Sequence, residues 1–320
     1  MKTMKAVVLD KITKASDIVL SDFFIPEVSE GWVLIKVKAF GMNHSEQILR
    51  LNEIEADYIK KPIIPGIECA GEIVDGGNTD FKKGQKVIAL MGGMGRSFNG
   101  SYAEYVLAPV HHTFAVESGL KWEQLAAIPE TFFTAWGSLF ECLHLTPKDT
   151  LLIRGATCAL GYASIQLAKA LGCKVIATTH RTDKLSLISN ADIQIVDDGI
   201  LKGKTGGVTK ALELVGPKTI RDTLALMEKG GIVCNTGILG GVFSLNGFDP
   251  IKEIPNGVYL TGFFSNYPTR ENIDDMFQFL NENGIEPQIG KVFGFEDIRE
   301  AVTAQDSGKV NGKIIVKMSD

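Results

Sequence analysis

Three features are missing from the sequence, and each absence excludes a class of protein. No apolar run approaches the roughly 20 residues that a membrane-spanning helix needs. The formal net charge of −5 gives no electrostatic reason to expect nucleic acid or an anionic membrane as a partner. No C-x-x-C pair exists among the five cysteines, so neither a disulfide framework nor a four-cysteine zinc site is indicated: Cys69, Cys142, Cys158, Cys173 and Cys234.

The N-terminal residues also lack the long apolar core of a signal peptide and are expected to form a first strand. Together with cysteines that are expected to be free thiols, this predicts a cytoplasmic protein. A length of 320 residues with 45% hydrophobic residues is typical of a globular protein, and it is long for a single core. Two domains are therefore the expectation.

Residues 1–120 carry short alternating strands separated by turn signals, which predicts a compact β-rich domain with barrel-like pairing. From 121 to 285, strands alternate with helices, which predicts an α/β domain with a doubly wound parallel sheet. Residues 286–320 end in a strand, Lys313–Lys317, that is expected to return to the β-rich domain. The strands expected in the second domain are Thr150–Arg154, Lys174–Thr178, Ile193–Val196, Ala211–Leu214, Gly231–Asn235 and Val258–Gly262.

The turn Gly155–Gly161 lies between a buried strand and an amphipathic helix. Backbone N–H groups and the helix N-terminus in such a turn face an anion in dinucleotide sites. The glycine pattern departs from G-x-G-x-x-G, because Ala156 and Cys158 stand where the first two glycines are expected. A Cβ at Cys158 stands where a pyrophosphate approaches closest, and the alternative is a βαβ crossover that binds nothing.

The end of the next strand carries Thr178, Thr179, His180 and Arg181, followed one helical turn later by Lys184. A carboxylate is usual there when a site prefers NAD, whereas two cations and an imidazole suit the 2′-phosphate of NADPH. The alternative, a solvated basic helix start, is unfavourable at a helix N-terminus. The sequence therefore predicts NADPH in preference to NADH.

Several segments in order along nearly the whole chain resemble the medium-chain dehydrogenase/reductase superfamily, and specifically its zinc-free quinone oxidoreductase branch, which includes zeta-crystallin. The segments are Phe40–Asn43, Pro65–Glu72, Gly84–Val87, Gly100–Val106, Thr134–Trp136, Ile165–Gly172 and Gly308–Lys313. The resemblance implies a GroES-like catalytic domain followed by a Rossmann domain that binds NADPH. It also implies a homodimer formed through the edge strand Val258–Phe264.

Zinc alcohol dehydrogenases of this superfamily place a cysteine ligand near residues 41–43 and a histidine in a Gly-His-Glu motif. This chain has Gly41-Met-Asn-His44 and Gly66-Ile-Glu68 at these places. Both ligands are absent, and Glu68 with Cys69 does not supply the set that tetrahedral zinc needs. We therefore expect no metal.

The resemblance implies hydride transfer from NADPH to a quinone or an α,β-unsaturated carbonyl, with Asn43 near the reacting ring and Thr134 as a weaker contact. It places Ala159 and Leu160 beside the diphosphate, and Arg181 and Lys184 beside the 2′-phosphate. It places Gly237, Ile238 and Leu239 beside the nicotinamide. His44 is a candidate proton donor, since the unperturbed pKa of histidine lies near 6.5.

Two alternatives to a quinone reductase remain open: an alkenal or enone double-bond reductase, and a cofactor-binding protein with little turnover. The ligand is expected where the two domains meet.

The glycine-rich loop Met91–Gly100 is followed by no helix, so it is expected to be a flexible loop. Its Arg96 and Phe98 are expected either to reach a ligand or to form an exposed turn. The acidic stretch Asn52–Asp57 is expected to be solvated surface.

Overall fold

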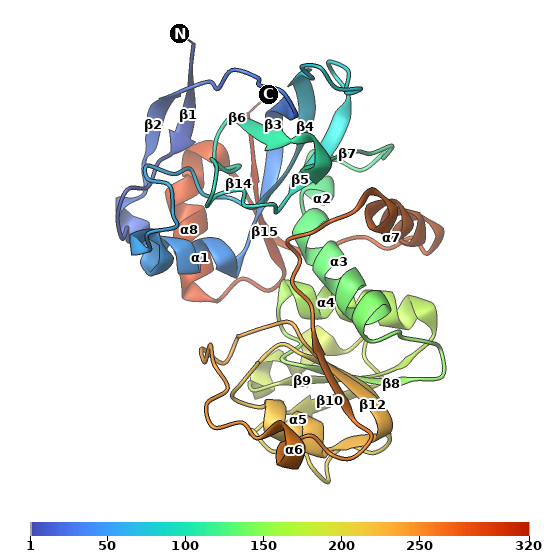
Figure 1. Cartoon of the computed structure of the whole chain (residues 1–320). Coiled ribbons are helices and arrows are strands. Elements are labelled where there is room, and N and C mark those ends of the chain that lie inside the picture. Colours follow the sequence, from blue (N-terminus) through green and yellow to red (C-terminus); the bar gives the residue numbers. More distant parts are fainter. Residues whose placement is uncertain (1, 320) are drawn as a thin grey trace. The chain divides into compact units, whose positions relative to one another are not determined.

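The computed structural model describes residues 2–319 and divides the chain into two compact units (Figure 1). Unit 1 holds the residues up to Glu130, the segment Asn266–Asp274 and the residues from Glu286 onward. Unit 2 holds Thr131–Ser265 and Asp275–Ile285. Two helices, α3 (Pro129–Trp136) and α7 (Arg270–Glu282), each run from one unit into the other.

Unit 1 is built on a seven-stranded sheet with the order β14-β15-β3-β4-β5-β7, in which β6 also pairs with β3. Its pairings are antiparallel except that β14 and β15 run parallel. A separate antiparallel pair is formed by β1 (Thr3–Val7) and β2 (Leu20–Phe24). The sheet strands are β3 (Trp32–Met42), β4 (Glu68–Asp75), β5 (Lys86–Leu90), β6 (Tyr105–Pro109), β7 (Thr113–Ala115), β14 (Ile289–Gly294) and β15 (Lys313–Lys317).

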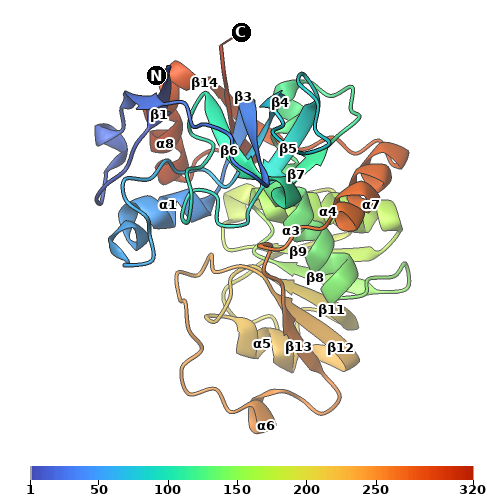
Figure 2. The ribbon, with the colours of Figure 1, turned by 45° about the horizontal axis from the view of Figure 1, so that its top comes forward.

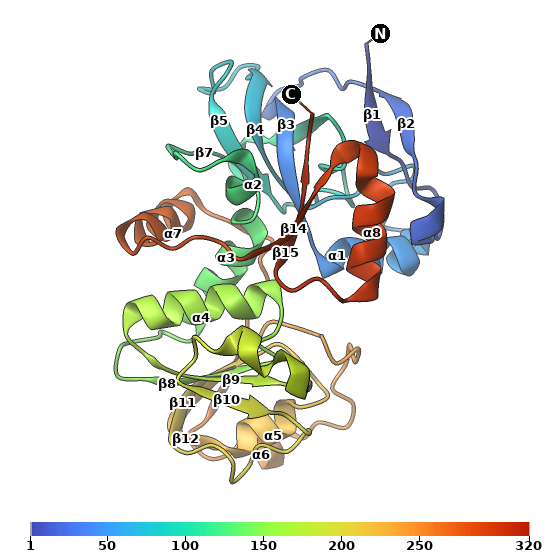
Figure 3. The same cartoon turned by 180° about the vertical axis from the view of Figure 1, so that it is seen from behind.

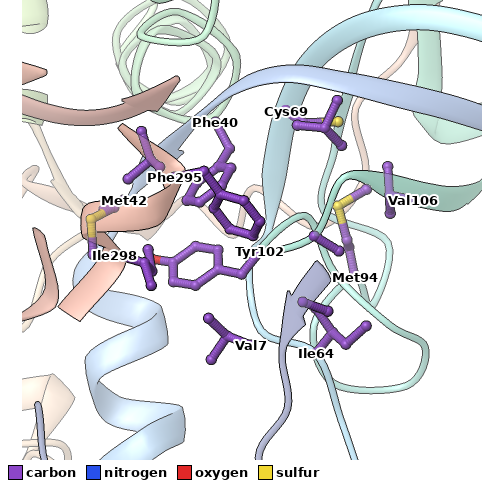
Figure 4. Packing of buried hydrophobic residues seen from close by; sticks show 14 of the residues in the cluster. Val7, Phe40, Met42, Ile64, Cys69, Met94, Tyr102, Val106, Phe295 and Ile298 are labelled. Atoms are coloured by element: carbon purple, nitrogen blue, oxygen red, sulfur yellow. The ribbon is translucent and has the colours of Figure 1, made fainter. Parts of the chain in front are cut away.

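Within the described residues, three α-helices lie wholly in unit 1: α1 (His44–Leu51), α2 (Trp122–Leu125) and α8 (Ile298–Ser307). Aromatic rings fill the core between these elements. The Phe40 ring stacks on Tyr102 with centroids 4.4 Å apart and meets Phe295 edge-on at 6.1 Å (Figure 4). These contacts fix the end of β3, and with it the start of α1, against a closely packed core.

Unit 2 contains a six-stranded parallel sheet with the order β10-β9-β8-β11-β12-β13. This is the 3-2-1-4-5-6 order of a doubly wound nucleotide-binding sheet, and it confirms the predicted fold class. β13 forms one edge of the sheet (Figure 2). The strands are β8 (Thr150–Arg154), β9 (Lys174–Thr179), β10 (Ile193–Val196), β11 (Val208–Glu213), β12 (Met227–Asn235) and β13 (Tyr259–Gly262).

Helices α4 (Ala159–Leu171) and α5 (Ile220–Ala225) lie on opposite faces of this sheet (Figure 3). α4 carries the apolar face predicted from the sequence and ends at Gly172, whose φ of +93° is the left-handed conformation that favours glycine. The short helix α6 spans Pro250–Glu253. Among residues 2–319, no helix is long and apolar enough to cross a bilayer.

The structure differs from the prediction at several elements. The helix expected over Thr131–Leu143 is divided, since α3 ends at Trp136 and a π-helix follows over Gly137–Cys142. Gly137 packs so closely on the Phe263 ring that a Cβ at position 137 would lie 2.0 Å from the ring. The spacing of apolar residues cannot predict such a contact between distant residues. The strand expected from Tyr102 begins at Tyr105, because Tyr102 N–H bonds to Pro65 O in a bend (3.0 Å).

Candidate functional site

Asn43 links the end of β3 to the start of α1, where it is the N-cap residue, and Glu46 is the third residue of the helix. The Asn43 N–H donates to Glu46 Oε2 at 2.6 Å, which satisfies a backbone group that a helix start leaves unpaired. The Ile67 N–H donates to the other oxygen, Oε1, at 3.1 Å. The Glu46 carboxyl therefore ties the α1 start to the segment that precedes β4.

The Asn43 side chain is held by two charged residues that lie far apart in the sequence. Its Nδ2 donates to Glu68 Oε1 at 2.8 Å, and Lys313 Nζ donates to its Oδ1 at 2.6 Å. Lys313 and Glu68 form an ion pair at 2.6 Å, with side chains only 3% and 0% exposed. Gly41 lies against this pair, and a Cβ there would be 2.5 Å from Glu68 Oε1, so this position requires glycine.

The second Glu68 oxygen accepts the Glu130 N–H at 2.7 Å. Four segments of unit 1 therefore meet at this carboxylate: the α1 start, β4, β15 and the start of α3. Sequence reasoning identified Asn43 in this cluster. It did not identify Lys313, Glu46 or the role of Glu68, because their meeting depends on how the strands pair.

This cluster does not suit a zinc ion. The group between Asn43 Oδ1 and Glu68 Oε1 is the Lys313 ammonium, 2.6 Å from each. Burial raises the pKa of the neighbouring Cys69 thiol to about 12, which keeps it from being the thiolate that zinc binds. Among residues 2–319, no group of three or more His, Cys, Asp or Glu side chains is placed to hold a metal.

His44 is exposed at the first position of α1, and a chain of hydrogen bonds fixes its tautomer. The Asp306 carboxylate accepts from Gln47 Nε2 at 2.9 Å, so Gln47 turns its Oε1 toward His44 Nδ1, 2.8 Å away. His44 Nδ1 therefore carries the proton in the neutral ring. Arg50 anchors Asp306 with two contacts of 2.6 Å. The Nε2 atom is then the acceptor of the neutral ring.

The loop Met91–Gly100 is anchored within unit 1. Arg96 donates to Glu53 at 2.6 Å and to Ser45 O at 3.2 Å, and the Phe98 ring packs edge-on against Trp32. The interpretation of Asn52–Asp57 as merely solvated surface was therefore wrong at Glu53, because this carboxylate holds Arg96. The hydrogen bond from Arg96 offsets burial and lowers the Glu53 pKa.

In unit 2 the loop Gly155–Gly161 leads from β8 into α4. Cys158 is the N-cap residue of α4, and its Sγ accepts from the Gly161 N–H at 3.4 Å. The thiol therefore points toward the N-terminal end of α4. A Cβ on Gly161 would lie 2.2 Å from Ala156 O, so a side chain at position 161 would clash with the loop backbone. Ala159 and Leu160 form the first turn, where backbone N–H groups lie at the positive end of the helix dipole. This cradle fits an anionic diphosphate.

The predicted 2′-phosphate residues differ in their surroundings. Thr178 is buried and accepts the Gly155 N–H at 3.1 Å, so it supports the loop from the sheet side. His180 and Arg181 are exposed, and Lys184 is half-buried. Arg181 pairs with Asp183 at 2.5 Å, a carboxylate that sequence reasoning left out. The hydrogen bond from Arg181 lowers the pKa of Asp183. A 2′-phosphate therefore has to compete with Asp183 for Arg181.

Arg154, the last residue of β8, was also missed. Its side chain is fully buried and contacts Asp197 at 2.7 Å and Asp222 at 2.8 Å. Asp197 Oδ1 in turn accepts the Gly199 N–H at 2.8 Å, and Asp222 accepts the Leu201 N–H at the same distance. Arg154 therefore fixes the segment after β10 directly beside the start of the loop. A charged residue at the end of a buried strand was the available signal.

The remaining predicted residues are Thr134, which lies in α3, and Gly237, Ile238 and Leu239, which follow β12. Thr134 is buried in α3, and its carbonyl accepts from Ser138 Oγ at 2.7 Å. Gly237 follows β12 so closely that a Cβ would lie 2.3 Å from Leu214 O. Ile238 is half-buried and Leu239 is 50% exposed, with its N–H bonded to Leu214 O at 3.0 Å. Leu239 therefore presents an exposed apolar side chain from a backbone that is held in place.

Two family models match the chain. The alcohol dehydrogenase GroES-like domain matches residues 29–118, and the zinc-binding dehydrogenase model matches residues 189–316. A quinone oxidoreductase of Pongo abelii is 29% identical over 298 residues, covering 88% of this chain and 87% of that protein. An NAD-dependent alcohol dehydrogenase of Sulfolobus acidocaldarius is 27% identical over 351 residues, covering 99% and 100%.

Solved structures agree with this assignment of the fold. AibC superposes with a TM-score of 0.87 at 25% identity, covering 99% of this chain and 96% of that chain. The quinone oxidoreductase from Coxiella burnetii superposes with a TM-score of 0.85 at 22% identity, covering 99% and 100%. A GroES-like unit joined to a doubly wound parallel sheet is the architecture of a nicotinamide-dinucleotide-dependent oxidoreductase. The chain therefore carries an alcohol dehydrogenase GroES-like domain and a zinc-binding dehydrogenase domain, and it is similar to quinone oxidoreductases and to other medium-chain dehydrogenases/reductases.

The Glu46 carboxyl generates a prediction about stability and pH. Burial raises its pKa from 4.5 to about 7, with Lys313 opposing the shift. A raised folded-state pKa contributes stability that is present below about pH 4.5 and lost as the pH rises through about 7. Between these limits the wild type should lose about 3 kcal/mol of unfolding free energy relative to Glu46→Gln. Urea unfolding of both proteins at stepped pH measures this difference, and a difference independent of pH would contradict the assignment.

Proposed function

We propose that the protein is an NADPH-dependent reductase that transfers a hydride to a quinone or a similar electron-poor carbonyl compound without zinc. The observation that carries the proposal is the glycine-containing loop at the α4 N-terminus of a doubly wound sheet, in a chain similar to quinone oxidoreductases. An alkenal or enone double-bond reductase needs the same machinery, so it is the nearest alternative.

The residues of unit 2 provide the nucleotide contacts in this proposal. The first-turn N–H groups at Ala159 and Leu160 bind the diphosphate, and Arg181 with Lys184 and His180 binds the 2′-phosphate. Gly237 to Leu239 and Thr134 border the nicotinamide ring. NADPH, when bound, supplies the hydride.

In unit 1, Asn43 and His44 are the proposed catalytic residues. A quinone or enone oxygen gains negative charge as the hydride arrives, and an N–H donor stabilises that charge. The His44 ring keeps its proton on Nδ1 toward Gln47 and leaves Nε2 for the substrate. When the ring is protonated, Nε2 also donates, so His44 is suited to deliver the proton that completes the reduction.

The acceptor is tested by steady-state NADPH oxidation with a series of quinones and conjugated enals. We expect turnover that a chelator such as EDTA leaves unchanged, since the Asn43 cluster holds Lys313 where a metal would need ligands. A higher kcat/KM for quinones than for enals favours the first assignment, and the reverse favours the alternative. Cofactor binding with no turnover of any acceptor would contradict catalysis and favour a non-catalytic NADPH-binding protein.

Arg181 generates a prediction about cofactor choice. Replacing Arg181 with Ala removes a charged hydrogen-bond donor to the 2′-phosphate and should weaken NADPH binding about tenfold while leaving NADH nearly unchanged. Asp183→Asn should have the opposite effect, because it frees Arg181 from its present partner. Calorimetric titration with both nucleotides measures these changes. Equal losses for NADPH and NADH in Arg181→Ala would exclude a 2′-phosphate contact.

We further propose a homodimer through the edge strand Val258–Phe264. β13 leaves one row of backbone groups without a strand partner within the described chain, and its Tyr259 side chain is 61% exposed. Tyr259→Lys should shift the protein toward monomer, because it places like charges at the pairing edge. Ile251→Lys, at an apolar residue outside the strand that is still more exposed (90%), is the control. Light scattering that finds wild-type monomer at micromolar concentration would refute the dimer.

A further inference from the structure

The Asn43 side-chain amide has only one orientation that its partners accept. The Lys313 ammonium is a donor without acceptor capacity, and the ionised Glu68 carboxylate is an acceptor only. Oδ1 therefore faces Lys313, and Nδ2 faces Glu68. Rotating the amide by 180° would place N–H groups against the ammonium and an oxygen against the carboxylate. The ion pair thus selects which end of the amide each partner meets.

This orientation leaves a donor for a ligand. Nδ2 carries two protons, and within residues 2–319 the structure gives it one acceptor, Glu68 Oε1. Asn43 is half-buried, whereas Lys313 and Glu68 are 3% and 0% exposed. The amide is consequently the part of this cluster that a ligand reaches, and it offers an N–H group rather than a carbonyl.

Lys313 also strengthens that donor. A positive charge 2.6 Å from Oδ1 draws electron density toward the oxygen and makes the N–H protons more positive. Because both ions are buried, salt and water screen this effect little. The arrangement exists before any ligand arrives, so it costs no reorganisation during the reaction.

We propose that Lys313 and Glu68 are positioning residues that lock and polarise the Asn43 amide as an N–H donor to the substrate oxygen. The inference rests on the proposed function and refines its substrate class. In the reduction of an enone, the β-carbon gains a hydride from NADPH, which is oxidised to NADP⁺. The C=C electron pair moves to form an enolate, and the carbonyl π pair moves onto the oxygen that Asn43 Nδ2–H binds. Protonation by water or His44 then gives the saturated ketone.

A locked donor discriminates between substrates. A conjugated carbonyl oxygen or quinone oxygen becomes more negative during reduction and gains from an N–H donor. An alcohol that is to be oxidised has to lose its hydroxyl proton, and Asn43 Nδ2–H cannot accept it. The site therefore favours reduction of conjugated carbonyl compounds over oxidation of simple alcohols, although alcohol dehydrogenases are among the relatives.

The test compares Lys313→Met with the double variant Glu68→Gln/Lys313→Met, which leaves no unpaired buried charge if the single variant fails to fold. Both should lower kcat about 100-fold for a quinone or enone, the scale of losing one oxyanion donor, with KM for NADPH unchanged. Lys313→Arg keeps the positive charge, so its kcat should be higher than that of Lys313→Met. Lys317→Met is the matched control, because Lys317 lies on the same strand and pairs with Glu123 near the surface (3.6 Å). A folded double variant with kcat within about twofold of wild type would overturn the proposal.

A second readout does not need turnover, so it separates this proposal from the proposed function. The Asn43 side-chain amide signal in a ¹⁵N NMR spectrum is identified by its loss in Asn43→Ser. In the wild type the proton that donates to Glu68 should exchange slowly with solvent. In the double variant this proton should exchange at least about tenfold faster and shift upfield, whereas Lys317→Met should leave it unchanged. Unchanged exchange in the double variant would disprove the lock, and a wild type inactive toward all acceptors would instead disprove the reductase function.

Discussion

The buried ion pair between Lys313 and Glu68 is the interaction on which unit 1 depends. A single charge left in this position would cost several kcal/mol, so each residue requires the other. The pair joins the last strand of the chain to β4, and through Glu68 it also holds Asn43 and the Glu130 N–H. The ion pair therefore attaches β15 to the rest of the GroES-like unit. The same two residues also fix the Asn43 amide, which we propose to act in the reaction.

In unit 2 a buried charged residue holds the loop Gly155–Gly161 in a comparable way. Arg154 is fully buried at the end of β8 and is neutralised by Asp197 and Asp222, which hold the segments after β10 and within α5. Gly155 follows immediately, so the loop starts from a position that charged contacts define. The Cys158 departure from the glycine pattern is accommodated in the same region, because the thiol caps α4 and leaves the first-turn N–H groups for an anion.

Much of the fold follows from the sequence. The boundaries of β8, β10 and β15 match the predicted ranges, because short apolar runs bounded by turn residues specify buried strands. Candidate site residues could be predicted from the sequence only where neighbouring residues carry the signal, as at Asn43 or in the Gly155–Gly161 loop. Lys313 meets Asn43 across 270 residues, a contact that exists only through strand pairing. Glu53 was misjudged for the same reason, since it was considered without its partner Arg96.

The proposed function requires that the chain binds NADPH and uses it for reduction. Titrating the wild-type protein with NADPH and with NADH, with its three tryptophans as fluorescent reporters, tests this most directly. We expect saturable quenching by both nucleotides, with clearly tighter binding of NADPH. If neither nucleotide changes the fluorescence and calorimetry also detects no binding, the loop before α4 is not a working cofactor site and the reductase assignment is wrong.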